Sequence, residues 1–176
     1  WKVVETLHET VSPWVKVIAE TVIDEAGSRL EYWRVEKDDS IIVLPFHRDC
    51  LILPRPFYRH GLQRHAYDFP GGRWNPDSDI TETAMSILLR ELGIEEKSVM
   101  SLRPLNKTPW PVNSSFSNQH LHGFVAELSP ALNFSDKPDM EVFATDRAGL
   151  GSLLERLCCL QCRCVLLDWF YRTQNK

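Results

Sequence analysis

The residues with the clearest chemical potential lie in and around one stretch of helical pattern. Glu91 stands near the end of this stretch, and Asp77, Asp79 and Glu82 stand around its start. Carboxylates are the ligands that Mg²⁺ and Mn²⁺ prefer, so several of them on one helical face would predict metal-dependent chemistry. Glu82 precedes Glu91 by about two and a half turns, so these two side chains project from distant parts of the helix. Because acids at a helix start are favoured by capping and by the helix dipole, we interpret the three early acids as capping residues.

A second candidate site is the cysteine-rich segment near the end of the chain. Four of the five cysteines lie between residues 158 and 164, and Cys159-Leu160-Gln161-Cys162 has the C-x-x-C spacing of zinc and redox sites. No second C-x-x-C pair or paired-histidine motif accompanies it in the sequence. The apolar residues around it favour thiols packed in the core of a helical tail over a zinc or redox site. The odd, clustered cysteines also argue against the disulfide framework of a secreted protein.

Basic and aromatic side chains are the candidates for binding a nucleotide. Five basic residues are close in sequence and could attract a phosphate: Arg55, Arg59, His60, Arg64 and His65. For Arg59 a surface salt bridge is an equally good interpretation. Packing is the commoner role of tryptophan, although an indole could stack on a base. Four tryptophans are candidates, the last two being the strongest: Trp14, Trp33, Trp74 and Trp110.

The composition indicates one ordinary domain with a substantial core. A chain of 176 residues with 43% hydrophobic and 25% charged residues fits that class. A net charge of −4 argues against nucleic acid or an anionic membrane as a partner. The sequence has no apolar run long enough to span a bilayer and no signal-peptide pattern, so we expect a cytoplasmic protein with reduced thiols.

Periodicity predicts the elements that position these residues. A helix is predicted from Ile80 to Leu92, with Asp79 and Glu82 as a capping box and Gly93 as its stop. Strands before and after one central helix, followed by helices, predict an α+β or layered α-β-α domain. The other expected elements are a hairpin over 14–24 and 29–36, two strands over 41–46 and 51–55 that are buried on both faces, strands near 99–102, 120–127 and 142–144, and a helical tail over 150–173 that breaks near 161–163.

The segment from Phe69-Pro70-Gly71-Gly72 through this helix to Gly93-Ile94 resembles the Nudix box. The box has the pattern G-x5-E-x7-R-E-U-x-E-E-x-G-U, where U is an aliphatic residue, and the frame fits without a gap. Beyond the anchoring Gly72, four positions agree with the pattern: Leu88, Glu91, Gly93 and Ile94. Four positions depart from it: Ser78, Ile87 and Arg90 replace glutamates, and Ser86 replaces the arginine.

These departures fall on the metal-binding face of the box. In active relatives the glutamates matching positions 87, 90 and 91 bind divalent metal, together with the backbone carbonyl matching Gly71. Here the charge of that face changes from minus three to zero. Glu91 is then the one catalytic carboxylate that the resemblance preserves, and any retained Mg²⁺ or Mn²⁺ would use Glu91, Gly71 and Asp68. Arg90 would repel a cation but could contact a phosphate directly.

The rest of the chain, from about Trp14 to about Trp169, resembles the ADP-ribose pyrophosphatase branch. Tyr58-Arg59-His60-Gly61 and Tyr67-Asp68-Phe69-Pro70 look like its R-Q-Y-R-H-G and E-L-P-A-G segments, with Asp68 in the place of the glutamate. This likeness implies that Arg59 lies near the phosphates of the ligand. The loop 108–115 resembles the branch's S-P-G loop without its glycine, which implies a ligand-side position for Trp110. Relatives draw a general base from the region of Asp136, Asp139 and Glu141, where we favour a solvated loop.

The resemblance implies a fold and three functional hypotheses. The fold would be α+β: a Nudix domain over 39–176, with an α-β-α sandwich around a mixed sheet, and an N-terminal antiparallel β subdomain over 1–38 that forms homodimers. We expect an impaired Nudix protein that binds a nucleotide or nucleotide sugar as a pseudoenzyme. The alternatives are an active Mg²⁺-dependent pyrophosphohydrolase, its metal site rebuilt from Glu91, Asp68, Asp77 or Asp79, and a structural or regulatory dimer with a vestigial cleft.

Overall fold

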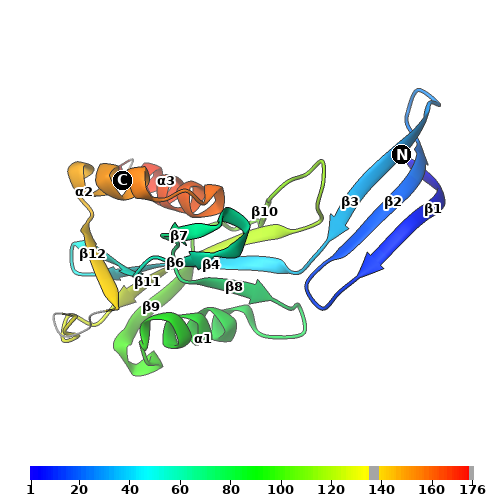
Figure 1. The fold of residues 1–176 in the computed structure, drawn as a ribbon. Helices are drawn as coiled ribbons and strands as arrows, with labels where there is room; N and C mark the ends of the chain where they lie inside the picture. Colours follow the sequence, from blue (N-terminus) through cyan, green and yellow to red (C-terminus); the bar gives the residue numbers. More distant parts are fainter. Residues whose placement is uncertain (135–138, 175–176) are drawn as a thin grey trace.

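A mixed β-sheet lies between two layers of helices in the computed structural model, which describes residues 1–134 and 139–174 (Figure 1). The seven strands follow the order β10-β11-β4-β5-β12, with β8 also pairing with β4 and β9 with β11. β11 is parallel to β4, and the other pairs are antiparallel. The strand bounds are β4 Asp39–His47, β5 Cys50–Pro54, β8 Gly71–Trp74, β9 Val99–Pro104, β10 Trp110–Pro111, β11 His120–Leu128 and β12 Met140–Ala144.

Apolar side chains on both faces of this sheet form the core, as the continuous apolar runs of β4 and β5 predict. One face packs against α1 (Ile80–Leu92), which contributes Ile87 and Leu88. The other face packs against α2 (Arg147–Arg156) and α3 (Leu160–Gln174), which contribute Leu153 and Val165. The expected α-β-α layering is therefore confirmed, and so are the strands expected near 99–102, 120–127 and 142–144.

The N-terminal residues form a separate sheet that projects from the body (Figure 1). Its antiparallel order is β1-β2-β3, with β1 Lys2–Val11, β2 Lys16–Ile23 and β3 Arg29–Glu36. The expected hairpin corresponds to β2 and β3, whereas β1 was not predicted. Every residue of β1 is exposed, so this strand has no buried face to impose an alternating pattern on its sequence.

α1 has the bounds that its sequence predicts, with Asp79 as its N-terminal cap and Gly93 as its stop, but the Glu82 carboxylate does not complete the expected capping box among the described residues. The Asp79 carboxylate accepts hydrogen bonds from the backbone N–H groups of Thr81 and Glu82, at 2.8 and 2.9 Å. Gly93 ends the helix with φ of 59°, a left-handed conformation that glycine adopts without strain. The helix therefore begins and ends where local chemistry requires, and this places Arg90 and Glu91 in its last turn.

The helical tail breaks earlier than its sequence predicts. The break falls at residues 157–159 and not near 161–163. Leu157 is extended and forms a bridge with Tyr67, so its backbone is drawn into a contact with a distant segment. Among the described residues, none of the helices combines the length and the hydrophobicity needed to cross a bilayer.

Two short strands complete the framework of the site. β6 (Phe57–Arg59) and β7 (Arg64–Ala66) form an antiparallel hairpin, joined by a 3-10 turn over His60–Leu62. A second 3-10 turn, over Glu96–Ser98, connects α1 to β9. The β6-β7 hairpin lies between the sheet and the start of α3, and it positions Arg59 and the segment that leads to Asp68 (Figure 1).

Candidate functional site

A cleft of about 560 Å³ opens where the glycine turn before β8, the end of α1 and the start of α3 meet. Five residues singled out from the sequence line it together: Arg59, Asp68, Gly71, Arg90 and Glu91. The lining also includes Lys37 and Arg73, of which Arg73 directs its guanidinium to Pro13, Trp14 and Asp38. Four basic and two acidic residues thus line the cleft, in a chain whose formal net charge is −4.

The guanidinium of Arg90 joins the two positions to which the resemblance to the Nudix box assigned a metal ion, Gly71 and Glu91. Its Nη2 donates to the Gly71 carbonyl oxygen at 2.9 Å and to Glu91 Oε1 at 2.7 Å. The other Glu91 oxygen accepts the Gly71 N–H at 3.3 Å. A positive charge thus lies between the carbonyl and the carboxylate that a cation would use, and this charge belongs to the protein.

Ile87 and Gly72 are compatible with this position of the Arg90 guanidinium. Ile87 is buried at 1% exposure, so position 87 contributes to the core under α1 and offers no ligand. A Cβ at Gly72 would lie 3.2 Å from Ile87 Cδ1 and 3.3 Å from Arg90 Nη2. The missing side chain of Gly72 therefore leaves the room that the Arg90 guanidinium occupies. With one carboxylate, already paired, the described residues of this helix face do not fit a two-metal centre.

Arg59 and Asp68, which also line the cleft, form an ion pair. Asp68 is 7% exposed, and the Arg59 guanidinium also lies 3.8 Å from the centre of the Phe57 ring. The Nε of Arg59 is buried and has no hydrogen-bond partner among the described residues. The salt-bridge interpretation of Arg59 is thus confirmed, and its position near a phosphate stays a prediction.

Two cysteines of the C-x-x-C segment line the same cleft beside Asp68. Cys162 is buried, and its thiol lies 3.5 Å from Asp68 Oδ1. Cys159 is half-buried just before α3, and a hydrogen bond from the Cys162 thiol lowers the pKa of Cys159 to about 6. The same hydrogen bond, together with burial, raises the pKa of Cys162. The interpretation as core thiols therefore describes Cys162, but Cys159 faces the cleft and both Cys158 and Cys164 are exposed.

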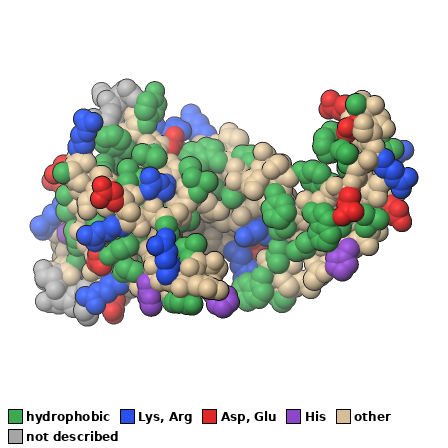
Figure 2. All heavy atoms as spheres, turned by 45° about the horizontal axis from the view of Figure 1, so that its top comes forward, with side chains coloured by type: hydrophobic (Ala, Val, Ile, Leu, Met, Phe, Trp, Pro, Cys, Tyr) green, Lys and Arg blue, Asp and Glu red, His purple; other side chains and the backbone are tan. Residues whose placement is uncertain are grey.

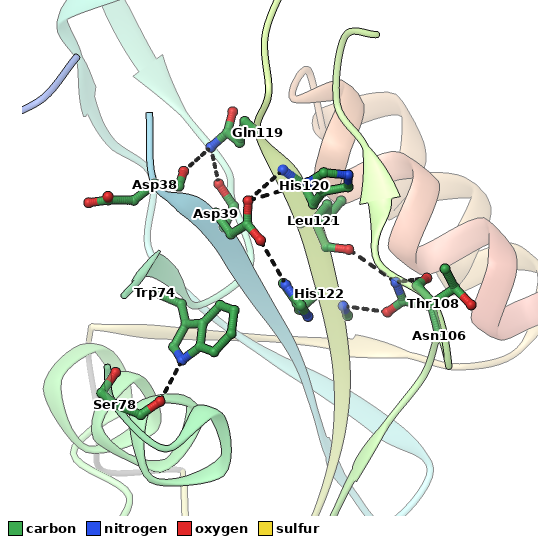
Figure 3. Close-up of polar contacts among 12 residues, drawn as sticks. Asp38, Asp39, Trp74, Ser78, Asn106, Thr108, Gln119, His120, Leu121 and His122 are labelled. Atoms are coloured by element: carbon green, nitrogen blue, oxygen red, sulfur yellow. Dashed lines mark hydrogen bonds and ion pairs between the residues drawn. The ribbon is translucent and has the colours of Figure 1, made fainter. Parts of the chain in front are cut away.

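The two tryptophan candidates lie outside this cleft. Trp74 packs edge-on against His122 with ring centres 5.0 Å apart, and its Nε1 donates to the Ser78 carbonyl at 2.9 Å (Figure 3). These contacts give Trp74 a packing role, and its role in stacking on a base stays a prediction. Trp110 lines a neighbouring apolar pocket of about 690 Å³, which shares Cys159 and Gln161 with the cleft.

A network of hydrogen bonds that the sequence analysis did not predict connects β11 to β4 next to the cleft (Figure 3). Asp39 accepts a hydrogen bond from the His120 N–H at 2.8 Å and contacts the His122 ring nitrogen at 3.2 Å. The buried amide of Gln119, which also lines the cleft, donates to the Asp38 carbonyl and the Ser40 hydroxyl. These residues lie about eighty positions apart in sequence and carry no motif, so no local pattern could have connected them.

The acids considered as general bases have separate positions. Both Glu141 oxygens accept from the Tyr67 hydroxyl at 2.8 Å, and Arg156 pairs with Glu141 at 3.5 Å. The Asp139 carbonyl accepts the Arg55 N–H at 3.0 Å. Asp136 lies outside the described residues. Glu141 is thus held by Tyr67 and Arg156 and does not line the cleft, whereas Asp139 lines an adjoining pocket of about 460 Å³ together with Glu91.

Comparison with known proteins supports the fold. No protein-family model matches the sequence, and no curated protein is similar enough to count as a relative. Among solved structures, one described as an ADP compounds hydrolase superposes with a TM-score of 0.75 over 97% of this chain and 94% of that chain, at 20% sequence identity. An identity this low carries the fold and not the activity. The chain has a Nudix-like α+β fold, in which a central mixed sheet is joined to an N-terminal antiparallel sheet.

Proposed function

We propose that this protein binds a nucleotide or nucleotide sugar of the ADP-ribose type in the cleft and hydrolyses it poorly or not at all. The observation that carries this proposal is the position of Arg90, whose guanidinium bridges the Gly71 carbonyl and the Glu91 carboxylate. A diphosphate needs positive charge around it, and in this cleft arginine supplies that charge in place of metal. Arginine does not generate the nucleophilic water that a bound metal supplies, which is why hydrolysis would be lost while binding remains.

The charge distribution supports an anionic ligand. The cleft concentrates Lys37, Arg59, Arg73 and Arg90 against two acids, although the whole chain is negative. The Arg59 side chain lines the cleft and is 41% exposed, so its guanidinium can reach a phosphate oxygen. The structural neighbour described as an ADP compounds hydrolase is consistent with a nucleoside diphosphate as the chemical class.

The adjoining apolar pocket suits the base of such a ligand. Trp110 lines it beside Leu121, Leu160 and Leu167, and it meets the cleft at Cys159. Ligand sites commonly combine an apolar compartment with a few polar groups that fix orientation. We therefore place the diphosphate between Arg59 and Arg90 and the base beside Trp110.

The alternative function is a working Mg²⁺- or Mn²⁺-dependent pyrophosphohydrolase with a rebuilt metal site. In its favour, Glu91, Asp68 and the Gly71 carbonyl line one cleft. Against it, Glu91 pairs with Arg90, Asp68 pairs with Arg59, and the Asp79 carboxylate caps α1. Each of these acids would have to exchange an existing partner for the ion.

The test measures binding and turnover separately. The purified protein is titrated with ADP-ribose in the presence of EDTA, and binding is followed by calorimetry and thermal shift. Product formation is then measured with Mg²⁺ or Mn²⁺. Binding in EDTA without metal-dependent product supports the proposal, and turnover that Glu91→Gln abolishes establishes the alternative. Absence of both signals across nucleoside diphosphates would favour the third hypothesis, a structural dimer with a vestigial cleft.

The N-terminal sheet supports a homodimer as the assembled form. Val3 and Leu30 flank Val22 in the strand register, and both are exposed. Figure 2 shows hydrophobic side chains at the surface of the projecting sheet. Exposed apolar patches on a projecting sheet are typical of interfaces. Light scattering after size exclusion should give the mass of two chains, and Leu30→Glu should shift it toward one. Leu89→Glu is the matched control, since Leu89 is exposed on α1 and lies outside this sheet.

A further inference from the structure

Asp68, Cys159 and Cys162 converge although they come from distant parts of the chain. Their ligand atoms, one carboxylate oxygen and two sulfurs, all lie within 4.8 Å of one another. Asp68 precedes the glycine turn of β8, and the cysteines flank the start of α3. We propose that these three residues bind one zinc ion at the wall of the cleft, with a coordination position left open toward the cleft.

The geometry is close to a tetrahedral zinc site. Zinc bonds of about 2.0–2.3 Å at tetrahedral angles separate the ligand atoms by about 3.3–3.8 Å. The ligand atoms now lie within 4.8 Å of one another, so they would have to approach by about 1.0–1.5 Å at most. Cys159 is half-buried and directly precedes α3, so a rotation of its side chain can supply this movement. Three protein ligands with a free fourth position are typical of zinc sites that accept a water or a ligand.

The ligand types select the metal. Two thiolates are soft ligands that favour zinc over Mg²⁺, and a carboxylate is a common additional ligand. Two thiolates and a carboxylate carry three negative charges, which Zn²⁺ and the adjacent Arg59 would neutralise. The Arg59 guanidinium contacts Asp68 Oδ2, so Oδ1 is the oxygen directed at the thiols. Such an outer partner orients a ligating carboxylate.

The buried groups of the cluster are directed at one another. The Cys162 thiol lies 3.5 Å from Asp68 Oδ1, and the Cys159 sulfur lies within 4.8 Å of both of these atoms. Cys162 and Asp68 are both buried, and polar groups in such positions require partners. Zinc would take both sulfurs and the carboxylate oxygen as ligands, and each thiol that carries a proton would release it. Simple packing of thiols explains the position of Cys162 but not the carboxylate directed at it.

Metal binding can be tested without any nucleotide. The full chain, reduced and freed of metal, is titrated with Co²⁺ while the absorption of thiolate-to-cobalt charge transfer is recorded, and Zn²⁺ is then added. We expect saturation at one Co²⁺ per chain, and Zn²⁺ should abolish the absorption. Cys159→Ser and Asp68→Asn should each weaken Co²⁺ binding by about 100-fold or more, because loss of an outer partner alone costs about 10–100-fold. Circular dichroism verifies that each variant is folded.

The matched control is the double variant Cys158→Ser/Cys164→Ser, which removes two exposed thiols next to the cluster. It should bind Co²⁺ like the parent chain. The proposal is overturned if the parent chain shows no charge-transfer absorption, if Cys159→Ser retains it, or if Asp68→Asn binds with unchanged affinity. A Cys159–Cys162 disulfide that persists in reductant, detected as the loss of two hydrogens by mass spectrometry, would also overturn it. These outcomes do not depend on nucleotide binding, so the proposed function stands or falls separately.

Discussion

Replacement of Arg90 by methionine distinguishes between two roles of the cleft: binding a diphosphate without metal, and binding a divalent metal ion. The change keeps much of the length of the side chain but removes the cation that lies between the Gly71 carbonyl and Glu91. The variant should lose affinity for a diphosphate in the absence of metal and gain affinity for Mn²⁺. An opposite effect on two ligands is diagnostic, because a general loss of structure would weaken both.

The magnitudes follow from the contacts of Arg90. A hydrogen bond to a charged group contributes about 1.5–3 kcal/mol, so the diphosphate should bind about 10- to 150-fold more weakly. The Arg90 side chain is 57% exposed, and an exposed ion pair contributes only about 0–1 kcal/mol. Freeing Glu91 and the Gly71 carbonyl from Arg90 should therefore add only a small amount to the binding free energy of Mn²⁺. Removing the repulsion between the Arg90 charge and the ion adds a further amount. We expect the affinity for Mn²⁺ to rise by about 5- to 20-fold.

The assay is calorimetric titration of ADP-ribose in EDTA, paired with titration of Mn²⁺ followed by the electron paramagnetic resonance of the free ion. Arg103→Met is the matched control, since it makes the same charge change on β9, outside the cleft residues. The control should leave both affinities within about twofold. If Arg90→Met binds ADP-ribose in EDTA as tightly as the parent chain and gains no affinity for Mn²⁺, the role assigned to Arg90 is refuted.

Three further predictions concern reactivity and stability. In EDTA, the rate of alkylation of Cys159 should rise with pH through an inflection near 6, because its thiolate forms above that pKa. An unperturbed thiol would give an inflection near about 8.5, and Cys159→Ser should abolish the phase near 6. Asp79→Ala removes two capping hydrogen bonds and should cost about 1 kcal/mol, or about 2–4 °C in Tm; an unchanged Tm would contradict the capping role. Gly149→Ala should destabilise by about 1–3 kcal/mol, because its Cβ would clash with the Ala144 carbonyl, while Gly151→Ala, with open space around it, should be neutral or stabilising in the same thermal unfolding measurement.

Local chemistry determined the parts of this protein that the sequence alone predicts. The bounds of α1 depend on Asp79 and Gly93, and both act within a few residues of their own positions. The apolar runs of β4 and β5 likewise predict strands buried on both faces. The loss of ligating side chains at positions 87 and 90 follows from residue types alone. What these features share is that their physical causes lie within one turn or one strand.

Tertiary structure alone decided which residues meet at the cleft. Asp68 and Cys162 are 94 positions apart, and their contact depends on α3 packing across the sheet from α1. Trp74 does not line the cleft, because its indole packs against His122 and donates to the Ser78 carbonyl. The break in the helical tail moved because the Leu157 backbone pairs with Tyr67. Arg90 could be recognised in the sequence as a substitution, but its position between Gly71 and Glu91 required the turn and the helix end to be packed together.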